Sequence, residues 1–425
     1  MKSLLHIFTL LIIALSITPA ISAERFPPPD FESGYQLPDG IAVDQPSATS
    51  QTEEYLTVVI LFIALSLASY LAIRKRSRKG MILLTIFSLA FFGFYRQGCI
   101  CPIGAIQNFT LAVFDSGYTI PLSAILILIL PLIFTLFFGR TFCAAICPLG
   151  AIQELTIIKP LKLPRPLINA LSLGAYLYLA IAILLAAMGS MFAICKYDPF
   201  VAIFRLEGSK EMFIVGVALL ITGMFIARPY CRFLCPLGVI FNWLSRLSRW
   251  HLTITPDKCI SCKLCADSCP YEAIDAPIKP PAANELTAIR KRFIILLALT
   301  PVIIGIGIII GGLLSDSIAK IDPDIKTAIL LQAEIETNNQ GSSDETIAFY
   351  KTNQPVEEFF TQVNATRGSY NTATKIAGGF MGLVIALKLL SLSIYRRRTE
   401  YQPNPATCYS CGQCFQSCPI GKNAE

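Results

Sequence analysis

Long apolar stretches, separated by short polar segments, dominate this chain and predict membrane-spanning helices. Seven of them approach the roughly 20 apolar residues that a helix needs to cross a bilayer. They cover Tyr55–Ile73, Met81–Tyr95, Ile120–Phe138, Ile168–Ser190, Met212–Ala227, Phe293–Leu314 and Ile376–Ile394. The pattern predicts an all-α, polytopic membrane protein.

Composition agrees with this interpretation. Of the 425 residues, 54% are hydrophobic and 15% are charged, whereas a soluble domain carries about a quarter charged residues. Basic residues gather just outside the apolar stretches, so the net charge of +7 indicates membrane orientation and not nucleic-acid binding.

The positive-inside rule orients the predicted spans. The basic run Arg74–Lys79 follows the first span and is expected in the cytoplasm, together with residues 159–165, 228–249, 290–292 and 396–398. Residues 315–374 carry nine acidic and four basic side chains and are expected outside. We therefore predict a multi-pass protein of a bacterial inner (cytoplasmic) membrane with a cytoplasmic C-terminus.

The N-terminal 23 residues have the pattern of a secretory signal peptide. A lysine precedes an apolar run, and small residues follow at Ala20, Ser22 and Ala23. The alternative is an uncleaved extra span, and we favour cleavage. In both cases residues 24–54 are expected in the periplasm.

Two runs of four cysteines have the spacing Cys-x2-Cys-x2-Cys-x3-Cys-Pro, which binds [4Fe-4S] clusters. In two-cluster ferredoxins, the fourth cysteine of each run ligates the other cluster. We therefore predict two [4Fe-4S] clusters, and we disfavour zinc knuckles because both runs are complete. The first ferredoxin group is Cys259, Cys262, Cys265 and Cys418, and the second ferredoxin group is Cys408, Cys411, Cys414 and Cys269.

Two other motifs read Arg-x2-Cys-x3-Cys-Pro-Leu-Gly and begin at Arg140 and Arg228. Cysteines four apart share one helix face, and we expect the following proline to end each helix. Two such ends facing each other would present four thiolates, which suit iron–sulfur or zinc. Zinc cannot pass electrons, so we predict a third iron–sulfur centre in the membrane, its charge offset by the two arginines. This inner cysteine group is Cys143, Cys147, Cys231 and Cys235; the alternative is a helix–helix contact of small residues.

A third set, the outer cysteine group, is Cys99, Cys101 and Cys195. An outer-face iron centre here would need Asp198, Tyr197 or an exogenous ligand. The alternatives are a cycling dithiol in an oxidising compartment and inert cysteines surviving from a duplication. The chain has only two histidines, so no haem is expected.

The repeated motifs suggest that spans two–three and four–five are two copies of one helical hairpin. We predict a duplicated helical-hairpin transmembrane core with a cytoplasmic two-cluster ferredoxin-like module. The expected segments are a signal peptide (1–23), a periplasmic segment (24–54), a five-span core (55–250), a first ferredoxin half (251–289), a sixth span (290–314), an acidic periplasmic loop (315–374), a seventh span (375–395) and a second ferredoxin half (396–425).

The paired Cys-x3-Cys-Pro motifs and the ferredoxin runs resemble the NapH/NosR-type family of polytopic membrane 4Fe-4S ferredoxins. The resemblance covers about Arg96 to Pro270 and Cys408 to Pro419, and the periplasmic flavin-binding domain of NosR-type members has no match here. It implies electron transfer between the membrane or cytoplasm and a periplasmic acceptor. The ferredoxin cysteines carry over as [4Fe-4S] ligands.

We therefore predict a membrane-bound iron–sulfur electron-transfer protein. It would connect the cytoplasmic ferredoxin module, or a quinol pool, with a periplasmic redox protein or reductase. It would serve as a component of an oxidoreductase, such as a quinol dehydrogenase, and not as a self-sufficient enzyme. The alternatives are a transmembrane thiol–disulfide reductant exporter and a redox-sensing or maturation factor for a periplasmic reductase.

Overall fold

The computed structural model describes residues 50–98, 101–205, 209–254, 259–278, 283–337, 341, 343–352, 354–395 and 398–419. The predicted signal peptide, most of segment 24–54 and Cys99 lie outside the described residues. Residues 51–425 form one compact unit, and this unit is described below.

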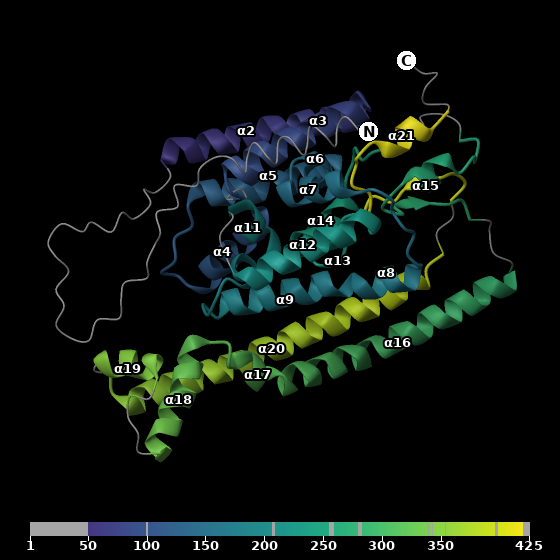
Figure 1. The fold of residues 1–425 in the computed structure, drawn as a ribbon. Coiled ribbons are helices and arrows are strands. Elements are labelled where there is room, and N and C mark those ends of the chain that lie inside the picture. The colour runs from purple at the N-terminus through teal and green to yellow at the C-terminus, as the bar shows by residue number, and fades with distance from the viewer. Residues whose placement is uncertain are drawn as a thin grey trace. The chain divides into compact units, whose positions relative to one another are not determined.

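The regular elements in the described part of the unit are helices, apart from two short strands (Figure 1). Its first half consists of α2 (Gln51–Ser69), the π-helix η1 (Tyr70–Arg74), α3 (Arg78–Ser88), the π-helix η2 (Leu89–Tyr95), α4 (Pro102–Phe114), α5 (Leu122–Phe138), α6 (Thr141–Ala145), α7 (Pro148–Thr156), α8 (Arg165–Leu171), α9 (Leu173–Ala187), α10 (Ala193–Tyr197), α11 (Pro199–Arg205), α12 (Lys210–Phe225), α13 (Pro229–Phe233) and α14 (Pro236–Ser245).

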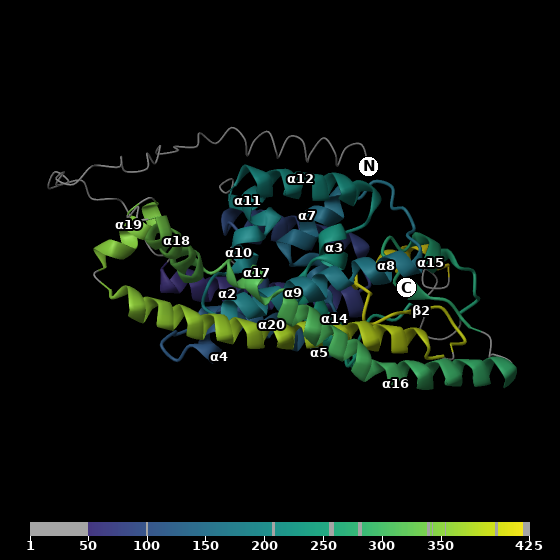
Figure 2. The ribbon, with the colours of Figure 1, turned by 90° about the horizontal axis from the view of Figure 1, so that it is seen from below.

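The second half adds α15 (Leu264–Ser268), β1 (Ile274–Asp275), α16 (Ala283–Leu313), α17 (Ser315–Ala319), α18 (Pro323–Thr337), α19 (Asp344–Lys351), α20 (Val356–Leu392), β2 (Gln402–Pro403) and α21 (Gln413–Ser417). Figure 1 shows α15 and α21 beside each other at one end of the helical core, and Figures 1 and 2 show α18 and α19 at the opposite end.

Within the described residues, five helical segments are long and apolar enough to cross a membrane, judged by length and composition. They are Gln51–Arg74, Arg78–Tyr95, Arg165–Ala187, Glu285–Leu313 and Val356–Leu392, and a sixth is counted if Pro199–Arg205 and Lys210–Phe225 form one bent span. The predicted spans Ile120–Phe138 and Met212–Ala227 fall on shorter helices, α5 with 17 residues and α12 with 16. Helix α5 ends at Phe138 because the next residue, Gly139, adopts a positive φ of 72°.

In the described part of the chain, six helices begin at a proline: α4 at Pro102, α7 at Pro148, α11 at Pro199, α13 at Pro229, α14 at Pro236 and α18 at Pro323. Proline suits the first position of a helix because its φ is already helical and its missing N–H has no partner there. The expectation that Pro148 and Pro236 end a helix was therefore wrong. Each begins the next helix, and the residue before it, Cys147 or Cys235, is the N-cap.

Residues 315–374, predicted as a loop, fold into α17, α18, α19 and the N-terminal half of α20. Their apolar side chains form a core that includes Ile325, Leu331, Phe349 and Phe359. The segment is therefore a small helical subdomain.

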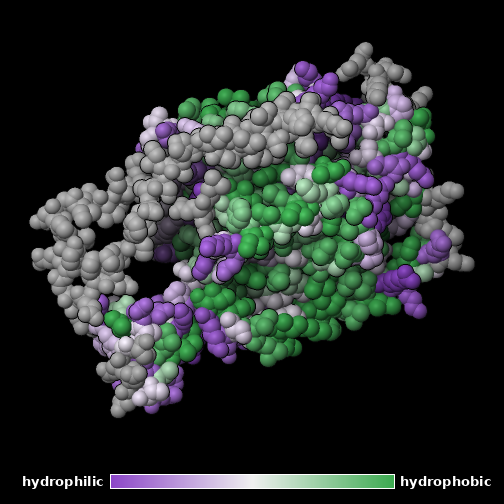
Figure 3. Space-filling model, in the orientation of Figure 1, coloured by the Kyte–Doolittle hydropathy of each residue, from purple (hydrophilic) through white to green (hydrophobic). Residues whose placement is uncertain are grey.

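Apolar side chains cover much of the surface of the helical core. Leu177 of α9, Leu387 of α20 and Ile309 of α16 are exposed, and Figure 3 shows a broad hydrophobic band with hydrophilic side chains gathered at both ends. A surface of this kind suits a lipid environment.

Helices α16 and α20 pack along each other with almost no space between their backbones. A Cβ atom placed on Gly378 would overlap the carbonyl oxygen of Gly307, and one on Gly311 would overlap that of Thr374. Small residues that let backbones approach closely are the usual basis of membrane helix pairing. The hairpin carries the chain from the first ferredoxin half to the second.

We expect Gly378→Ala to destabilise this hairpin by about 1–3 kcal/mol, the usual cost of overpacking. Thermal unfolding of the detergent-solubilised protein measures the effect. Gly305→Ala, in the partner helix α16, is the matched control, because no atom outside its own helical turn lies within 4 Å of a Cβ at that position. Equal melting temperatures for the two variants would contradict the close packing.

Candidate iron–sulfur sites

The two ferredoxin runs fold into one module although a helical hairpin separates them in sequence. Strand β1 pairs with β2 in antiparallel register, Ile274 opposite Pro403. Next to this ladder, Asp275 forms an ion pair with Arg398 at 2.7 Å. Helices α15 and α21 also pack together, so cysteines from both runs meet.

The local backbone explains how each run winds tightly around its cysteines. Ser261 and Ser410 have the same φ of 54°, and Lys263 and Gly412 also have positive φ values. Alternating left-handed and right-handed residues turn backbone N–H groups toward one side, which creates a concavity for an anionic group such as an iron–sulfur cluster. The two runs thus have matching local structures.

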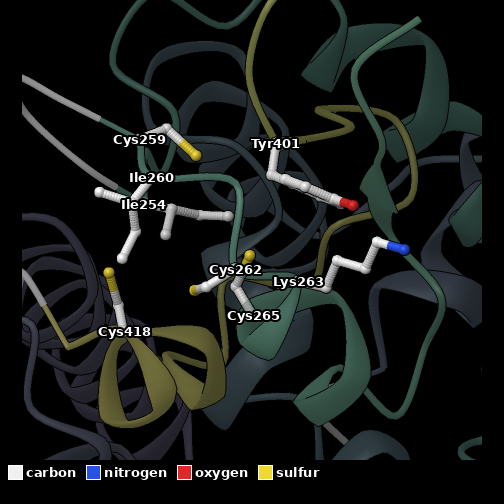
Figure 4. A pocket seen from close by; sticks show the side chains of 8 residues that line it. All are labelled: Ile254, Cys259, Ile260, Cys262, Lys263, Cys265, Tyr401 and Cys418. Carbon is white, nitrogen blue, oxygen red and sulfur yellow. The ribbon is translucent and has the colours of Figure 1, made fainter.

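The first ferredoxin group lines a single pocket. Figure 4 shows the side chains of its four cysteines around this pocket, together with those of Ile254, Ile260, Lys263 and Tyr401. Three of the cysteines come from the first run and Cys418 comes from the second. The structure therefore brings together the set predicted to ligate one cluster.

The second ferredoxin group is also assembled from both runs. Cys414 lies within electrostatic range of Cys408, Cys411 and Cys269. Cys411 and Cys414 are buried, each 8% exposed. Here one cysteine of the first run joins three of the second, whereas in the first ferredoxin group one cysteine of the second run joins three of the first.

The inner cysteine group comes together at a junction of four short helices. Cys143 lies in α6 and Cys231 in α13, while Cys147 and Cys235 cap α7 and α14. Cys147 lies within electrostatic range of the other three. The spacing suggested that the two cysteines of each motif share one continuous helix, and this was wrong. The helix is interrupted between α6 and α7 in the first motif and between α13 and α14 in the second.

The two motif arginines reach across from one copy of the motif to the other. Arg228, which is fully buried, donates to the carbonyl oxygens of Cys143 and, at 3.0 Å, Ala144. Arg140, 5% exposed, donates at 3.5 Å to the carbonyl oxygen of Gly238. The glycine of each Cys-Pro-Leu-Gly motif faces the opposite guanidinium: a Cβ on Gly150 would lie 3.2 Å from Arg228, and one on Gly238 would lie 3.4 Å from Arg140.

These surroundings fit an anionic iron–sulfur centre held by the four thiols. Arg140 is buried beside Cys143, Cys231 and Cys235, and its Nε has no hydrogen-bond partner in the described part of the chain. Gln153 donates to the sulfur of Cys231 at 3.4 Å. Such a centre would add single-electron chemistry, and its negative charge would compensate the buried guanidinium. Among the described residues, no three candidate ligands lie close enough together to bind a single metal ion. The four thiolates around a cubane cluster are farther apart than the ligands of a single ion.

The described members of the outer cysteine group lie near a buried aspartate. Cys101 is within electrostatic range of Asp198 and Cys195, and Asp198 is only 3% exposed. Its Oδ1 accepts the N–H of Phe200 at 2.9 Å, as an N-cap does. Tyr197, the other suggested ligand, is 47% exposed.

The fold and these sites define a membrane-embedded iron–sulfur protein that transfers electrons. A family model described as a 4Fe-4S binding domain matches residues 120–165 and 211–255, and a second model of the same description matches residues 252–275. No solved structure matches the chain significantly.

Three relatives give the comparison its detail. The uncharacterized protein MJ0750 of Methanocaldococcus jannaschii is 30% identical over 44% of this chain and 79% of its own length. The protein YccM of Escherichia coli, assigned by its name to electron transport, is 31% identical over 26% of this chain and 32% of its own length. The regulatory protein NosR of Pseudomonas aeruginosa is 31% identical over 19% of this chain and 12% of its own length.

The chain therefore belongs to the NapH/NosR-type family of polytopic membrane 4Fe-4S proteins. The family predicted from the cysteine motifs is confirmed, as is the electron-transfer, iron–sulfur character of the protein. The assignment of individual cysteines to individual clusters stays a prediction.

Sequence reading missed several polar and aromatic residues around the cysteines. Gln107 and Gln153 each follow a Cys-Pro motif in the shared sequence Gly-Ala-Ile-Gln, and this repetition was the available signal. Glu154, Tyr271 and Tyr409 carried no signal, because only the folded chain shows them between the ferredoxin module and the inner cysteine group.

We expect Cys265→Ala and Cys418→Ala to abolish the same cluster, because their side chains share one pocket. The double variant should then lose about four irons and keep the other cubane. Iron analysis and EPR of the anaerobically purified protein test this, with Cys269→Ala as the control that should abolish the other cluster. Loss of about eight irons in the double variant would show that each run binds its own cluster.

We expect Arg140→Gln to lower the midpoint potential of the inner centre, since a nearby positive charge favours the reduced, more negative form. The anticipated change is about tenfold in the reduction equilibrium, or about 59 mV for one electron. Potentiometric EPR titration measures it. Arg140→Lys, which keeps the charge, should preserve the potential better, and equal shifts in both variants would contradict an electrostatic role.

Proposed function

We propose that the protein is a transmembrane electron conduit between a cytoplasmic ferredoxin module or quinol pool and a periplasmic acceptor. The observation that carries this proposal is a continuous series of contacts between the cysteine groups. The first and second ferredoxin groups are neighbours, since Cys414 is within electrostatic range of Cys265. Iron–sulfur clusters held by these thiols would accept and release single electrons.

The next contact joins the second ferredoxin group to the inner cysteine group. Cys143 and Cys231 of the inner group pack against the same hydrophobic cluster as Cys269 and Cys408. Tyr409, which follows Cys408 in sequence, is 3% exposed and belongs to this cluster. The two groups are therefore separated by little more than side chains.

A single tyrosine joins the inner group to the outer group. Tyr230 precedes Cys231 in α13, and its hydroxyl donates to Oδ2 of Asp198 at 3.4 Å. Its ring meets that of Phe200 edge-on, with the centroids 5.2 Å apart. This contact supports a short path between the two groups, which a bare hydrocarbon core of roughly 30 Å would not provide.

Repetition supports the duplicated helical-hairpin architecture. Oε1 of Gln107 in α4 accepts the N–H of Ile194 in α10 at 3.0 Å, and Oε1 of Gln153 in α7 accepts that of Tyr230 in α13 at 3.1 Å. In each case the first copy binds the N-terminal end of a short cysteine-bearing helix in the second. The 4Fe-4S family model also matches the chain twice, once within each copy.

We further propose the membrane layout predicted from charge, with the ferredoxin module and the C-terminus in the cytoplasm and the subdomain of residues 315–374 in the periplasm. Some acids of this subdomain are not available to a partner: Asp322 is 5% and Glu334 3% exposed. The exposed ones are Asp316, Asp324, Glu336, Asp344, Glu345, Glu357 and Glu358. They suit the docking of a basic periplasmic redox protein.

Redox sensing is the second candidate, because the relative NosR is named a regulatory protein. A sensor needs clusters that change state but no steady electron flow. Reconstitution into liposomes separates the two, since only a conduit reduces an enclosed acceptor dye at a sustained rate when reductant is added outside.

We expect about twelve irons and twelve acid-labile sulfides per chain in the anaerobically purified protein, and about four fewer in the variant Cys143→Ser/Cys231→Ser. The reason is that four thiols and two buried arginines form the inner site. An excess over twelve would indicate metal at the outer cysteine group. About eight irons, unchanged in the variant, would show that only the ferredoxin module binds clusters.

A further inference from the structure

A buried carboxylate outside all the cysteine groups forms the centre of a charged network. Glu154 lies in α7 and is 8% exposed. Its Oε2 accepts hydrogen bonds from Nε of Arg228, at 2.9 Å, and from the hydroxyl of Tyr271, and its Oε1 accepts one from Arg78. Burial alone would raise the pKa of Glu154, but Arg228 and Arg78 lower it to about 2. The side chain is therefore an anion at neutral pH.

The partners of Glu154 come from separate parts of the molecule. Arg78 begins α3, and Arg228 belongs to the second Cys-x3-Cys-Pro motif. Tyr271 follows Cys269-Pro270 in the first ferredoxin run. Arg78 also donates to the carbonyl oxygen of Cys411 at 3.0 Å. One carboxylate thus ties the helical core to both halves of the ferredoxin module.

This network adjoins the hydrophobic cluster that lies between the second ferredoxin group and the inner cysteine group, because Tyr271 belongs to that cluster. The rings of Tyr271 and Tyr409 have centroids 4.8 Å apart. The guanidinium of Arg140 lies 4.5 Å from the centre of the Tyr409 ring, and that of Arg228 lies 5.2 Å from it. Cation–π contacts of this kind are strongest where water is excluded. Displacement of Tyr271 would therefore disturb both groups.

The repeated motif itself does not require an acid at this position. Glu154 is the seventh residue after Cys147, and the seventh residue after Cys235 is Asn242. The Oδ1 of Asn242 is buried and has no hydrogen-bond partner in the described part of the chain. The acid occurs in the copy that contacts Tyr271, which indicates a role in joining the ferredoxin module to the core.

We propose that Glu154 is a positioning residue for electron transfer between the second ferredoxin group and the inner cysteine group. It holds Tyr271, Arg78 and Arg228 in place, and its negative charge partly offsets the guanidinium groups beside the inner thiols. The proposal rests on the proposed function, because both groups must carry clusters.

The test compares Glu154→Gln, Tyr271→Phe and Asp267→Asn in the full-length, anaerobically purified protein. Asp267→Asn is the matched control, because the ion pair Lys162–Asp267 also links the core to the first ferredoxin run, but its side chains are 61% and 65% exposed. Exposed pairs of this kind contribute little. The measurements are iron content, EPR of the reduced protein, potentiometric titration, and hydrogen exchange of residues 259–278 and 398–419.

We expect Glu154→Gln to keep its iron, to weaken the magnetic interaction between the two reduced centres, and to speed hydrogen exchange in the module. Loss of the negative charge should also shift the inner centre toward its reduced form by about tenfold, which is about 59 mV for one electron. Tyr271→Phe removes the hydrogen bond to Glu154, so it should weaken the magnetic interaction between the two centres. It keeps the negative charge of Glu154, so it should leave the potential of the inner centre unchanged. Asp267→Asn should match the wild type in every measurement.

Two results would overturn the proposal. In the first, Glu154→Gln keeps the wild-type potential and the wild-type magnetic interaction, even if its hydrogen exchange is faster. Glu154 would then have a purely structural role. The other, decisive if Glu154→Gln does not assemble, is Tyr271→Phe with an undiminished interaction. Failure of the proposed function looks different, because the wild-type protein itself would then contain only about eight irons.

Discussion

The structure depends on burying two guanidinium groups next to four thiols. Removing a charge from water costs several kcal/mol unless it is paired and fully hydrogen-bonded. Arg228 meets this demand with Glu154 and with carbonyl oxygens of α6, whereas Arg140 has carbonyl and aromatic partners but no carboxylate within ion-pair distance in the described part of the chain. In the proposed inner centre, the thiols beside Arg140 would be deprotonated and would supply the missing negative charge.

The same interaction determines where the ferredoxin module binds. Arg140 donates to the carbonyl oxygen of Ala406 at 3.0 Å, just before the second ferredoxin run, and both arginines face the ring of Tyr409. The charges that suit an anionic centre in the core therefore also hold the module against it. Binding of the proposed inner centre and docking of the module would therefore depend on the same buried cations.

Proline and glycine make this crowded junction sterically possible. Pro148 and Pro236 begin new helices directly after a cysteine, so backbone N–H groups at the start of each helix point toward the thiol side. Gly150 and Gly238 then leave room for the arginine of the opposite copy. Any larger side chain at either glycine would push a guanidinium away from the inner group.

The sequence by itself determined the membrane character, the family and the types of ligand, because apolar length and cysteine spacing are local properties of the chain. It grouped the four inner cysteines, which the structure brings together, but it misjudged their helices, since the role of Pro148 depends on the turn that precedes it. Only the tertiary structure decided that Asp198 is buried near Cys101 whereas Tyr197 is exposed, and that Glu154 joins the core to Tyr271. These contacts connect residues far apart in sequence, and no local pattern of polarity or spacing records which distant side chains will share one buried site.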